Sequence, residues 1–360
     1  MSLTLVDAVD VLRRLDEFDT VVDARSEDEY ALDHLPGALN WPTLDNAQRH
    51  AVGTTYKQVN PFEARKMGAA IAARNIATHV EQRACDKSRS WRPLVYCWRG
   101  GQRSGSLSLV LDQIGFRVHI LQGGYKAFRA ALLADTERMA GQFNYQVVCG
   151  TTGSGKTRLL QSLARVGAQV LDLEALAHHR SSVLGAIPGL PQPSQKAFDT
   201  HIWDALRRMD PARPVVVESE SRKVGNVAVP AALMDAMRTR GHCLNLVLRD
   251  TERVALLMED YNFFVRDTET FCSRLDALIE IRGKATVQAW KSAVREGRLP
   301  DVVQDLLTQH YDPVYLQSMQ RNFRNFAKAR TVSPANRSAQ AMDALAASLD
   351  FERRGDWQEA

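Results

Sequence analysis

The feature that most limits the fold of this chain is the loop GTTGSGKT at residues 150–157. It matches the pattern G-x-x-x-x-G-K-[S/T], follows an apolar stretch at residues 145–149 that is typical of a buried strand, and precedes a helical pattern at residues 158–165. Its glycines allow backbone N–H groups to close around a diphosphate, while Lys156 neutralises the terminal phosphate and the Thr157 hydroxyl is placed to hold Mg²⁺. The sequence therefore predicts a phosphate-binding loop (P-loop) in an α/β domain, with the diphosphate-binding residues Gly150, Gly153, Ser154, Gly155, Lys156 and Thr157.

Further apolar runs follow this loop at residues 169–172, 214–218 and 243–248. Such runs are typical of central strands in a parallel sheet that is covered on both faces. Glu218 ends the second run, where many P-loop proteins carry an aspartate of the metal shell. A metal contact through water and a solvent-facing carboxylate are both compatible with this position. We expect a P-loop NTPase-like α/β domain over residues 140–255.

A short apolar strand at residues 92–96 leads into a second loop, Cys97-Trp98-Arg99-Gly100-Gly101-Gln102-Arg103-Ser104, and then into a helical pattern. Backbone N–H groups converge where a strand end meets a helix N-terminus, which favours a thiolate at Cys97 and an anion beside it. Arg99 and Arg103 add positive charge, and Arg103 offers two parallel donors to an oxyanion. An inert buried cysteine is the alternative. We interpret this segment as a nucleophile loop with Cys97, Arg99 and Arg103 as catalytic residues.

Strand patterns alternate with helical patterns over residues 1–135, which indicates a parallel-sheet domain with its functional loop at a strand C-terminus. The segments 22–25, 34–38 and 121–125, together with the cysteine loop, resemble the rhodanese (sulfurtransferase) family in order and spacing. The resemblance implies that Asp23 and Arg25 form a buried pair rather than act as catalysts. They would belong to a scaffold for the loop, together with Gly100, Gly101 and Ser104.

The spacing from Cys97 to Arg103 is Cys-x5-Arg, which is one residue longer than is usual in sulfurtransferases of the rhodanese fold. Cysteine-dependent phosphatases have this loop length, because their loop encloses a tetrahedral phosphate. We therefore expect a loop that is sized for a phosphate-like oxyanion as well as for a chalcogen atom.

The region 256–360 has helical periodicity, most clearly at residues 254–264 and 271–281. The pattern predicts that Arg321, Arg324 and Lys328 lie along one helical face. Phenylalanines interleave with these basic residues, so the segment has two interpretations: an RNA-binding surface, or a packed helix with a solvated basic face. The last residues, 353–360, are expected to be frayed.

The composition excludes several classes of protein. No apolar run approaches 18 residues and no signal peptide is indicated, so we expect no membrane span and no secretion. The five cysteines include no CxxC pair, which argues against a disulfide framework or a structural zinc site and favours the reducing cytoplasm. Adjacent His178 and His179 cannot share a helical face, so no metal site is predicted. The net charge of +4 confines any nucleic-acid surface to a local patch.

The order of the cysteine loop, the P-loop and the segment Gln192-Pro193-Ser194-Gln195 resembles the tRNA 2-selenouridine synthase family over nearly the whole chain. The resemblance implies an enzyme that replaces the sulfur of wobble 2-thiouridine in tRNA by selenium from selenophosphate. It also implies an S-geranylated intermediate made from geranyl diphosphate. Cys97 would attack the selenium donor or receive selenium as a perselenide-type adduct, and the P-loop would bind geranyl diphosphate. The implied partners are tRNA and a supplier of selenophosphate, without a tightly bound cofactor and with Mg²⁺ left open.

Other functions remain open at this point. The P-loop motif is also compatible with ATP or GTP. The cysteine loop is compatible with a cysteine-dependent phosphohydrolase, which would leave the P-loop domain unexplained, and with a tRNA sulfurtransferase. A non-catalytic adaptor is disfavoured, because decayed rhodanese modules commonly lose the nucleophile. The sequence does not indicate an oligomeric state.

Overall fold

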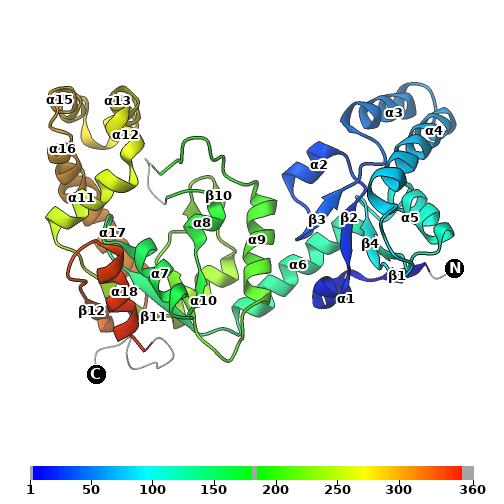
Figure 1. Ribbon diagram of the computed structural model, residues 1–360. Coiled ribbons are helices and arrows are strands. Elements are labelled where there is room, and N and C mark those ends of the chain that lie inside the picture. Colours follow the sequence, from blue (N-terminus) through cyan, green and yellow to red (C-terminus); the bar gives the residue numbers. More distant parts are fainter. Residues whose placement is uncertain (1–2, 181–184, 351–360) are drawn as a thin grey trace. The chain divides into compact units, whose positions relative to one another are not determined.

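The computed structural model describes residues 3–180 and 185–350. Contacts divide the chain into two compact units: Met1–Thr136 with Pro193–Asp204, and Glu137–Gln192 with Ala205–Ala360. Each unit contains a five-stranded parallel sheet (Figure 1). The predicted class is confirmed: the chain is α/β, with two parallel-sheet regions and a helical C-terminal region. The division into three domains stays a prediction, and the frayed tail expected at residues 353–360 lies outside the described residues.

The sheet of the first unit has the strand order β1-β5-β4-β2-β3. Its strands are β1 (Thr4–Val6), β2 (Thr20–Asp23), β3 (Ala38–Asn40), β4 (Pro93–Tyr96) and β5 (His119–Leu121). Asp23 pairs with Tyr96 in the register of β2 and β4, so the residues that follow these strands leave the sheet at the same edge. The side chains of β2 and β4 are almost wholly buried, as expected for strands with helices on both faces.

Helices cover this sheet and connect its strands. They are α1 (Ala8–Arg14), the 3₁₀ turn η1 (Leu15–Glu17), α2 (Glu27–Leu32), α3 (Asn46–Gln58), α4 (Pro61–His79), the π-helical turn η2 (Val80–Ala84), α5 (Gln102–Ile114) and α6 (Gly124–Ala140). Helix α9 (Gln195–Arg207) contributes most of its length to the same unit. The core on one face of the sheet joins strand residues to three aromatic rings, those of Trp41, Trp91 and Phe116.

The sheet of the second unit has the order β12-β11-β6-β8-β7. Its strands are β6 (Tyr145–Cys149), β7 (Gln169–Leu171), β8 (Val215–Glu218), β11 (His242–Leu246) and β12 (Arg330–Val332). Helices α7 (Lys156–Arg165) and α18 (Ala339–Ser348) pack together, and α8 (Leu173–Ala177), α10 (Ala231–Arg240) and the hairpin β9 (Lys223–Val224) and β10 (Val227–Ala228) complete this part. Since β6 leads into the P-loop and α7 begins at Lys156, the predicted strand–loop–helix unit is confirmed.

A cluster of helices follows β11. It consists of α11 (Asp250–Asp260), α12 (Asn262–Arg266), α13 (Thr268–Leu275), η3 (Asp276–Leu278), α14 (Ile279–Arg282), α15 (Lys284–Arg295), α16 (Leu299–Asp305), the π-helix η4 (Leu306–Tyr311) and α17 (Asp312–Asn322). These helices enclose a core of their own, which includes Phe264, Phe271 and Trp290. Among the described residues, the structure has no helix with both the length and the apolar character needed to cross a membrane.

The prediction that Arg321, Arg324 and Lys328 share one helical face is wrong. Helix α17 ends at Asn322, Phe323 is extended, and residues 326–328 form a single 3₁₀ turn, η5 (Phe326–Lys328). The chain then enters β12, which pairs in parallel with β11. Burial of this strand against the sheet outweighs the local helical periodicity. The ring of Phe323 is buried, so it is not available to stack on a base.

Candidate functional site

The nucleophile loop leaves β4 and folds back onto the start of α6. Cys97 is 3% exposed, and the buried hydroxyl of Ser104 donates a hydrogen bond to its sulfur at 3.1 Å. The backbone N–H groups of Tyr125 and Lys126 donate to the carbonyl oxygens of Cys97 and Trp98 at 2.8 and 3.1 Å. These two bonds fix the loop at two consecutive residues, while the Ser104 hydroxyl holds the sulfur from the first turn of α5.

Two glycines allow this close approach of backbone to backbone. Gly100 and Gly124 both have left-handed conformations, with φ of +67° and +60°. A Cβ at Gly124 would lie 2.3 Å from the carbonyl oxygen of Cys97 and 2.4 Å from the amide nitrogen of Gly100. Gly124 is therefore as much a part of the loop scaffold as the predicted Gly100 and Gly101, the second of which caps α5.

The structure gives Arg103 a partner that the sequence analysis missed. Nη1 and Nη2 of Arg103 donate to the two carboxylate oxygens of Glu29 at 2.6 and 3.3 Å. Glu29 is held in turn by Ser26, with which it forms the capping box of α2. Burial acts to raise the pKa of Glu29, but the hydrogen bond and charge of Arg103 outweigh it and hold this pKa below its usual value. The spacing Ser26-x-x-Glu29 is the only local signal that could have drawn attention to this carboxylate.

Asp23 and Arg25 form a buried ion pair below the loop. The Nη2 atom of Arg25 lies 2.6 Å from Oδ2 of Asp23, and the two residues are 1% and 0% exposed. Tyr96, at the end of β4, donates its hydroxyl to the same Asp23 oxygen at 2.7 Å. Arg25 also lies 4.0 Å from the centre of the Tyr125 ring, which belongs to the first turn of α6. The pair thus joins β2 to both segments that hold the nucleophile loop, a geometry that suits a scaffold role.

An open pocket of about 400 Å³ is lined by charged and aromatic side chains around this loop. Trp98 is 36% exposed and stacks on Tyr125, and the ammonium of Lys196 lies 5.6 Å from the centre of a Trp98 ring. The full lining is Arg25, Glu29, Leu32, Arg49, Trp98, Arg103, Tyr125 and Lys196. Cationic donors beside an exposed indole can bind an anion and a planar ring at one place.

The P-loop forms the second candidate site, in the second unit. The Lys156 ammonium donates to the carbonyl oxygens of Gly150 and Thr151 at 2.8 and 3.4 Å and lies 4.8 Å from the centre of the Tyr315 ring. The Ser154 hydroxyl is buried and has no hydrogen-bond partner among the described residues. A buried donor of this kind is costly unless a ligand binds it, so it suits an anion in the loop.

Carboxylates of α8 and of the end of β8 lie beside the P-loop. Thr157 donates its hydroxyl to Glu174 at 3.2 Å, and the Glu174 amide donates to Glu218 at 2.9 Å. Burial, followed by the negative charges of Glu174, Glu220 and Asp172, raises the pKa of Glu218 well above its usual value. A divalent cation beside Thr157 would relieve this repulsion. Among the described residues, however, no three His, Cys, Asp or Glu side chains are arranged to hold a metal ion by themselves.

Two family models match the chain. Residues 7–131 match the rhodanese-like domain, and residues 143–277 match the tRNA 2-selenouridine synthase AAA domain. The first match includes all strands of its sheet but β1, and the second includes all strands of its sheet but β12.

Curated relatives align with a larger part of the chain than either family model does. The tRNA 2-selenouridine synthase of Nitrosomonas europaea is 36% identical over 61% of this chain and 57% of its own length. The protein of the same name from Shewanella denitrificans is 30% identical over 82% of this chain and 87% of its own length. A solved rhodanese-related protein from Thermoplasma volcanium is 16% identical over 35% of this chain and 89% of its own, with a TM-score of 0.23.

Proposed function

Because the chain belongs to the tRNA 2-selenouridine synthase family, we propose that it replaces the sulfur of wobble 2-thiouridine in tRNA by selenium. Selenophosphate would donate the selenium, and geranyl diphosphate would first alkylate the sulfur. The observation that carries the proposal is the geometry of the cysteine loop: a buried sulfur that accepts a hydrogen bond from Ser104, in a loop with Arg103 beside an open cationic pocket. Binding to tRNA also implies action in the cytoplasm, with a selenophosphate-supplying enzyme as a further partner.

The alkylation step is assigned to the P-loop. The thiouridine sulfur forms a bond to C1 of the geranyl group, the C1–O bond breaks, and diphosphate leaves with the electron pair, while the N3 proton of the base is lost to water. Lys156, the Ser154 hydroxyl and the amides of the loop would stabilise the negative charge that develops on the leaving group. Thr157 and, through water, Glu218 are the residues that would hold Mg²⁺, which neutralises diphosphate charge when it is bound.

The selenium step is assigned to Cys97. Its thiolate attacks the phosphorus atom of selenophosphate, the P–Se bond breaks, and hydrogen selenide leaves with the electron pair. Arg99, Arg103 and the loop amides would hold the phosphate oxygens during this displacement. The selenide then attacks C2 of the S-geranylated uridine and expels geranyl thiol, and water hydrolyses the phosphocysteine. Trp98, which is partly exposed, would contact an unpaired base of the tRNA near this site.

Mass spectrometry of tRNA nucleosides tests both steps. Purified protein is incubated with thiolated tRNA and geranyl diphosphate, with selenophosphate, or with both. We expect a geranyl adduct in the first reaction and selenouridine in the third. Cys97→Ser should abolish selenouridine but retain the adduct, Lys156→Ala should abolish the adduct, and Cys85→Ser, at an exposed cysteine, should resemble the wild type.

The outcomes distinguish the alternatives. If Cys97→Ser still forms selenouridine, the role assigned to this residue is wrong. If no nucleoside changes but the protein hydrolyses an aryl phosphate in a Cys97-dependent manner, the phosphohydrolase interpretation replaces the proposal. An adduct that forms only in the presence of ATP or GTP would assign the P-loop to a nucleotide.

A further inference from the structure

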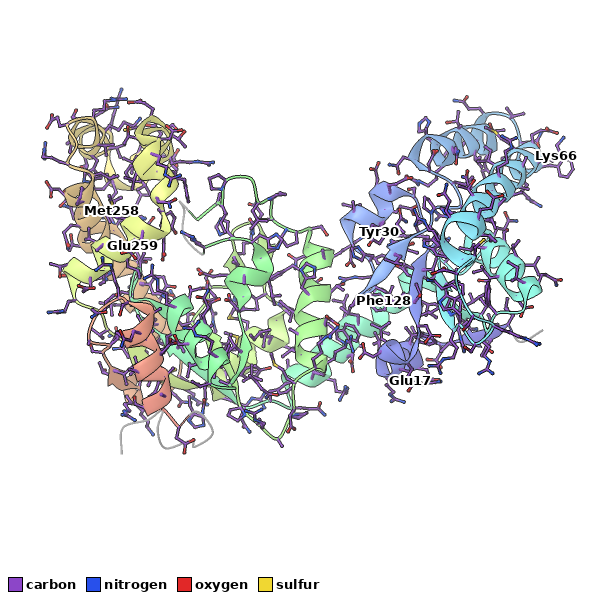
Figure 2. The ribbon with its side chains drawn as sticks, in the orientation of Figure 1. Glu17, Tyr30, Lys66, Phe128, Met258 and Glu259 are labelled. Atoms are coloured by element: carbon purple, nitrogen blue, oxygen red, sulfur yellow. The ribbon has the colours of Figure 1, made fainter. Side chains whose placement is uncertain are left out.

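An apolar cavity lies beside the P-loop in the second unit. Its volume is about 60 Å³. Apart from Thr152 it is lined by aliphatic and aromatic side chains of α11, α12, α13, α16 and η4, and by Tyr261 between α11 and α12. Met258, labelled in Figure 2, lines it from α11. Three lining residues, Leu306, Leu307 and Tyr311, belong to the π-helix η4. π-helical segments are rare and frequently occur at functional sites.

The cavity adjoins the P-loop pocket. Thr152, Leu257 and Tyr261 line both the cavity and the pocket of about 450 Å³ that contains Lys156 and Thr157. Leu257 packs directly on the loop, because a Cβ added to Gly153 would lie 3.1 Å from its side chain. The two hollows are therefore neighbours that share Leu257 as part of their walls, and a diphosphate head in the loop would lie within one side chain of the cavity.

A buried arginine connects the loop to the cavity wall. Arg253 is 5% exposed and donates to the carbonyl oxygen of Thr152 at 3.0 and 2.8 Å. It also forms a two-point ion pair with Asp312, at 2.9 and 2.6 Å, where η4 leads into α17. The phosphate-binding backbone and the apolar wall thus form one connected structure, so a head group and its tail are positioned together.

The cavity volume limits what it can hold. A buried water needs a cavity volume of about 10–15 Å³, so this cavity admits roughly four to six atoms or groups as large as a water molecule. One isoprene unit has five carbons and is of this size. A hydrocarbon of ten carbons extends beyond the cavity, and its first half would lie along Leu257 and Tyr261 toward the loop.

We propose that this cavity binds the terminal isoprene unit of the allylic diphosphate whose head group occupies the P-loop, and that it selects a ten-carbon chain. The proposal rests on the proposed function for the identity of the diphosphate, but it makes a separate statement about where the hydrocarbon lies. Inorganic diphosphate and the five-carbon dimethylallyl diphosphate would occupy the loop without filling the cavity. The fifteen-carbon farnesyl diphosphate would be too long for it.

Calorimetric titration of the full-length protein with four ligands tests the proposal: inorganic diphosphate and the dimethylallyl, geranyl and farnesyl diphosphates. We expect geranyl diphosphate to bind at least about tenfold more tightly than dimethylallyl or inorganic diphosphate, since burial of one isoprene unit is worth that factor or more. Farnesyl diphosphate should bind no more tightly than geranyl diphosphate. Equal affinity for all four ligands would overturn the proposal.

Variants locate the tail. Val303→Phe adds a ring to the cavity wall and should remove the advantage of geranyl diphosphate while leaving inorganic diphosphate unaffected. Val314→Phe adds the same ring on α17, where Val314 is 58% exposed, and should bind all four ligands like the wild type. If Val303→Phe does not fold, Leu307→Ala enlarges the cavity instead and should improve farnesyl diphosphate binding at least about threefold. An unchanged ligand preference in a folded cavity variant would contradict the assignment.

The binding assay distinguishes failure of the cavity assignment from failure of the proposed function. If the wild type forms no geranylated nucleoside but prefers geranyl diphosphate in a Val303-dependent manner, the proposed function fails and the cavity assignment stands. If the wild type geranylates tRNA but binds all four ligands equally, the cavity assignment fails and the proposed function stands.

Discussion

Replacing Gly124 with alanine perturbs the nucleophile loop without touching a catalytic side chain. A Cβ at this position would lie 2.3 Å from the carbonyl oxygen of Cys97, whereas ordinary contact begins at 3.4 Å, so the loop has to move by about 1 Å. Overpacking of this kind costs about 1–3 kcal/mol. The left-handed conformation, with φ of +60°, adds about 1–2 kcal/mol for alanine. We expect the free energy of unfolding to fall by about 2–5 kcal/mol.

The same displacement should affect the chemistry of Cys97. Because a misplacement of about 1 Å at a reacting group lowers a rate by about 100-fold, we expect selenouridine formation by Gly124→Ala to slow by about that factor. Urea denaturation measures the loss of stability, and nucleoside mass spectrometry under conditions where the variant is folded measures the loss of rate.

Gly37 provides the matched control. Its φ is +71°, but a Cβ there would have no neighbour within 4 Å. Gly37→Ala should therefore lose only the conformational part, about 1–2 kcal/mol, and keep the wild-type rate. If the two alanine variants behave alike in both assays, the loop is not held by contact with α6 and the reasoning is refuted.

Three further predictions concern charged side chains. Glu29→Gln should make the melting temperature depend less on pH below about 4.5. The lowered pKa of Glu29 stabilises the wild-type fold above the unfolded value near 4.5, and this stabilisation is lost as pH falls through the lowered pKa. Melting temperatures at pH 3–6 measure this, and parallel wild-type and variant curves would contradict it. Glu218→Gln should become more stable relative to the wild type as pH rises above about 4.5. The folded wild type has a raised pKa at Glu218, so its free energy of unfolding falls between the unfolded pKa and the folded one. A difference in stability between the two proteins that stays constant from pH 5 to 9 would refute this. Arg253→Met should lower the free energy of unfolding by about 3 kcal/mol, because it leaves Asp312 without its buried partner. An unchanged urea midpoint would show that this tether is not needed.

The parts that were predictable from the sequence have strong local patterns. Strand β6, the P-loop and the start of α7 follow each other without interruption, so composition and spacing are sufficient to place them. The same holds for β4 and the cysteine loop. In contrast, α3 and α4 were not predicted. Helix α3 has no buried residue, so it lacks the regular apolar stripe that would reveal it.

Residues that act through distant partners were missed for a different reason. Glu29 lies 74 positions before Arg103, and Arg253 contacts Thr152 and Asp312 at separations of 101 and 59 residues. Contacts of this range leave no periodicity in the sequence. The error at residues 321–330 has the same origin, because β12 exists only through its pairing with β11. The remaining site assignments, including the RNA-binding residues Arg321, Arg324 and Lys328, stay predictions.

The ion pair between Glu29 and Arg103 also sets what an anion has to offer before it can bind this arginine. Any anion that approaches Arg103 competes with a carboxylate that already satisfies two of its donors. A singly charged ion such as chloride offers the guanidinium no more than Glu29 does, so it gains little from entering. A phosphate-type anion with two or three negative charges offers more, and it can share the arginine with the carboxylate or displace it. Glu29 is thus a resident competitor for Arg103, which an incoming phosphate-type anion has to share or displace.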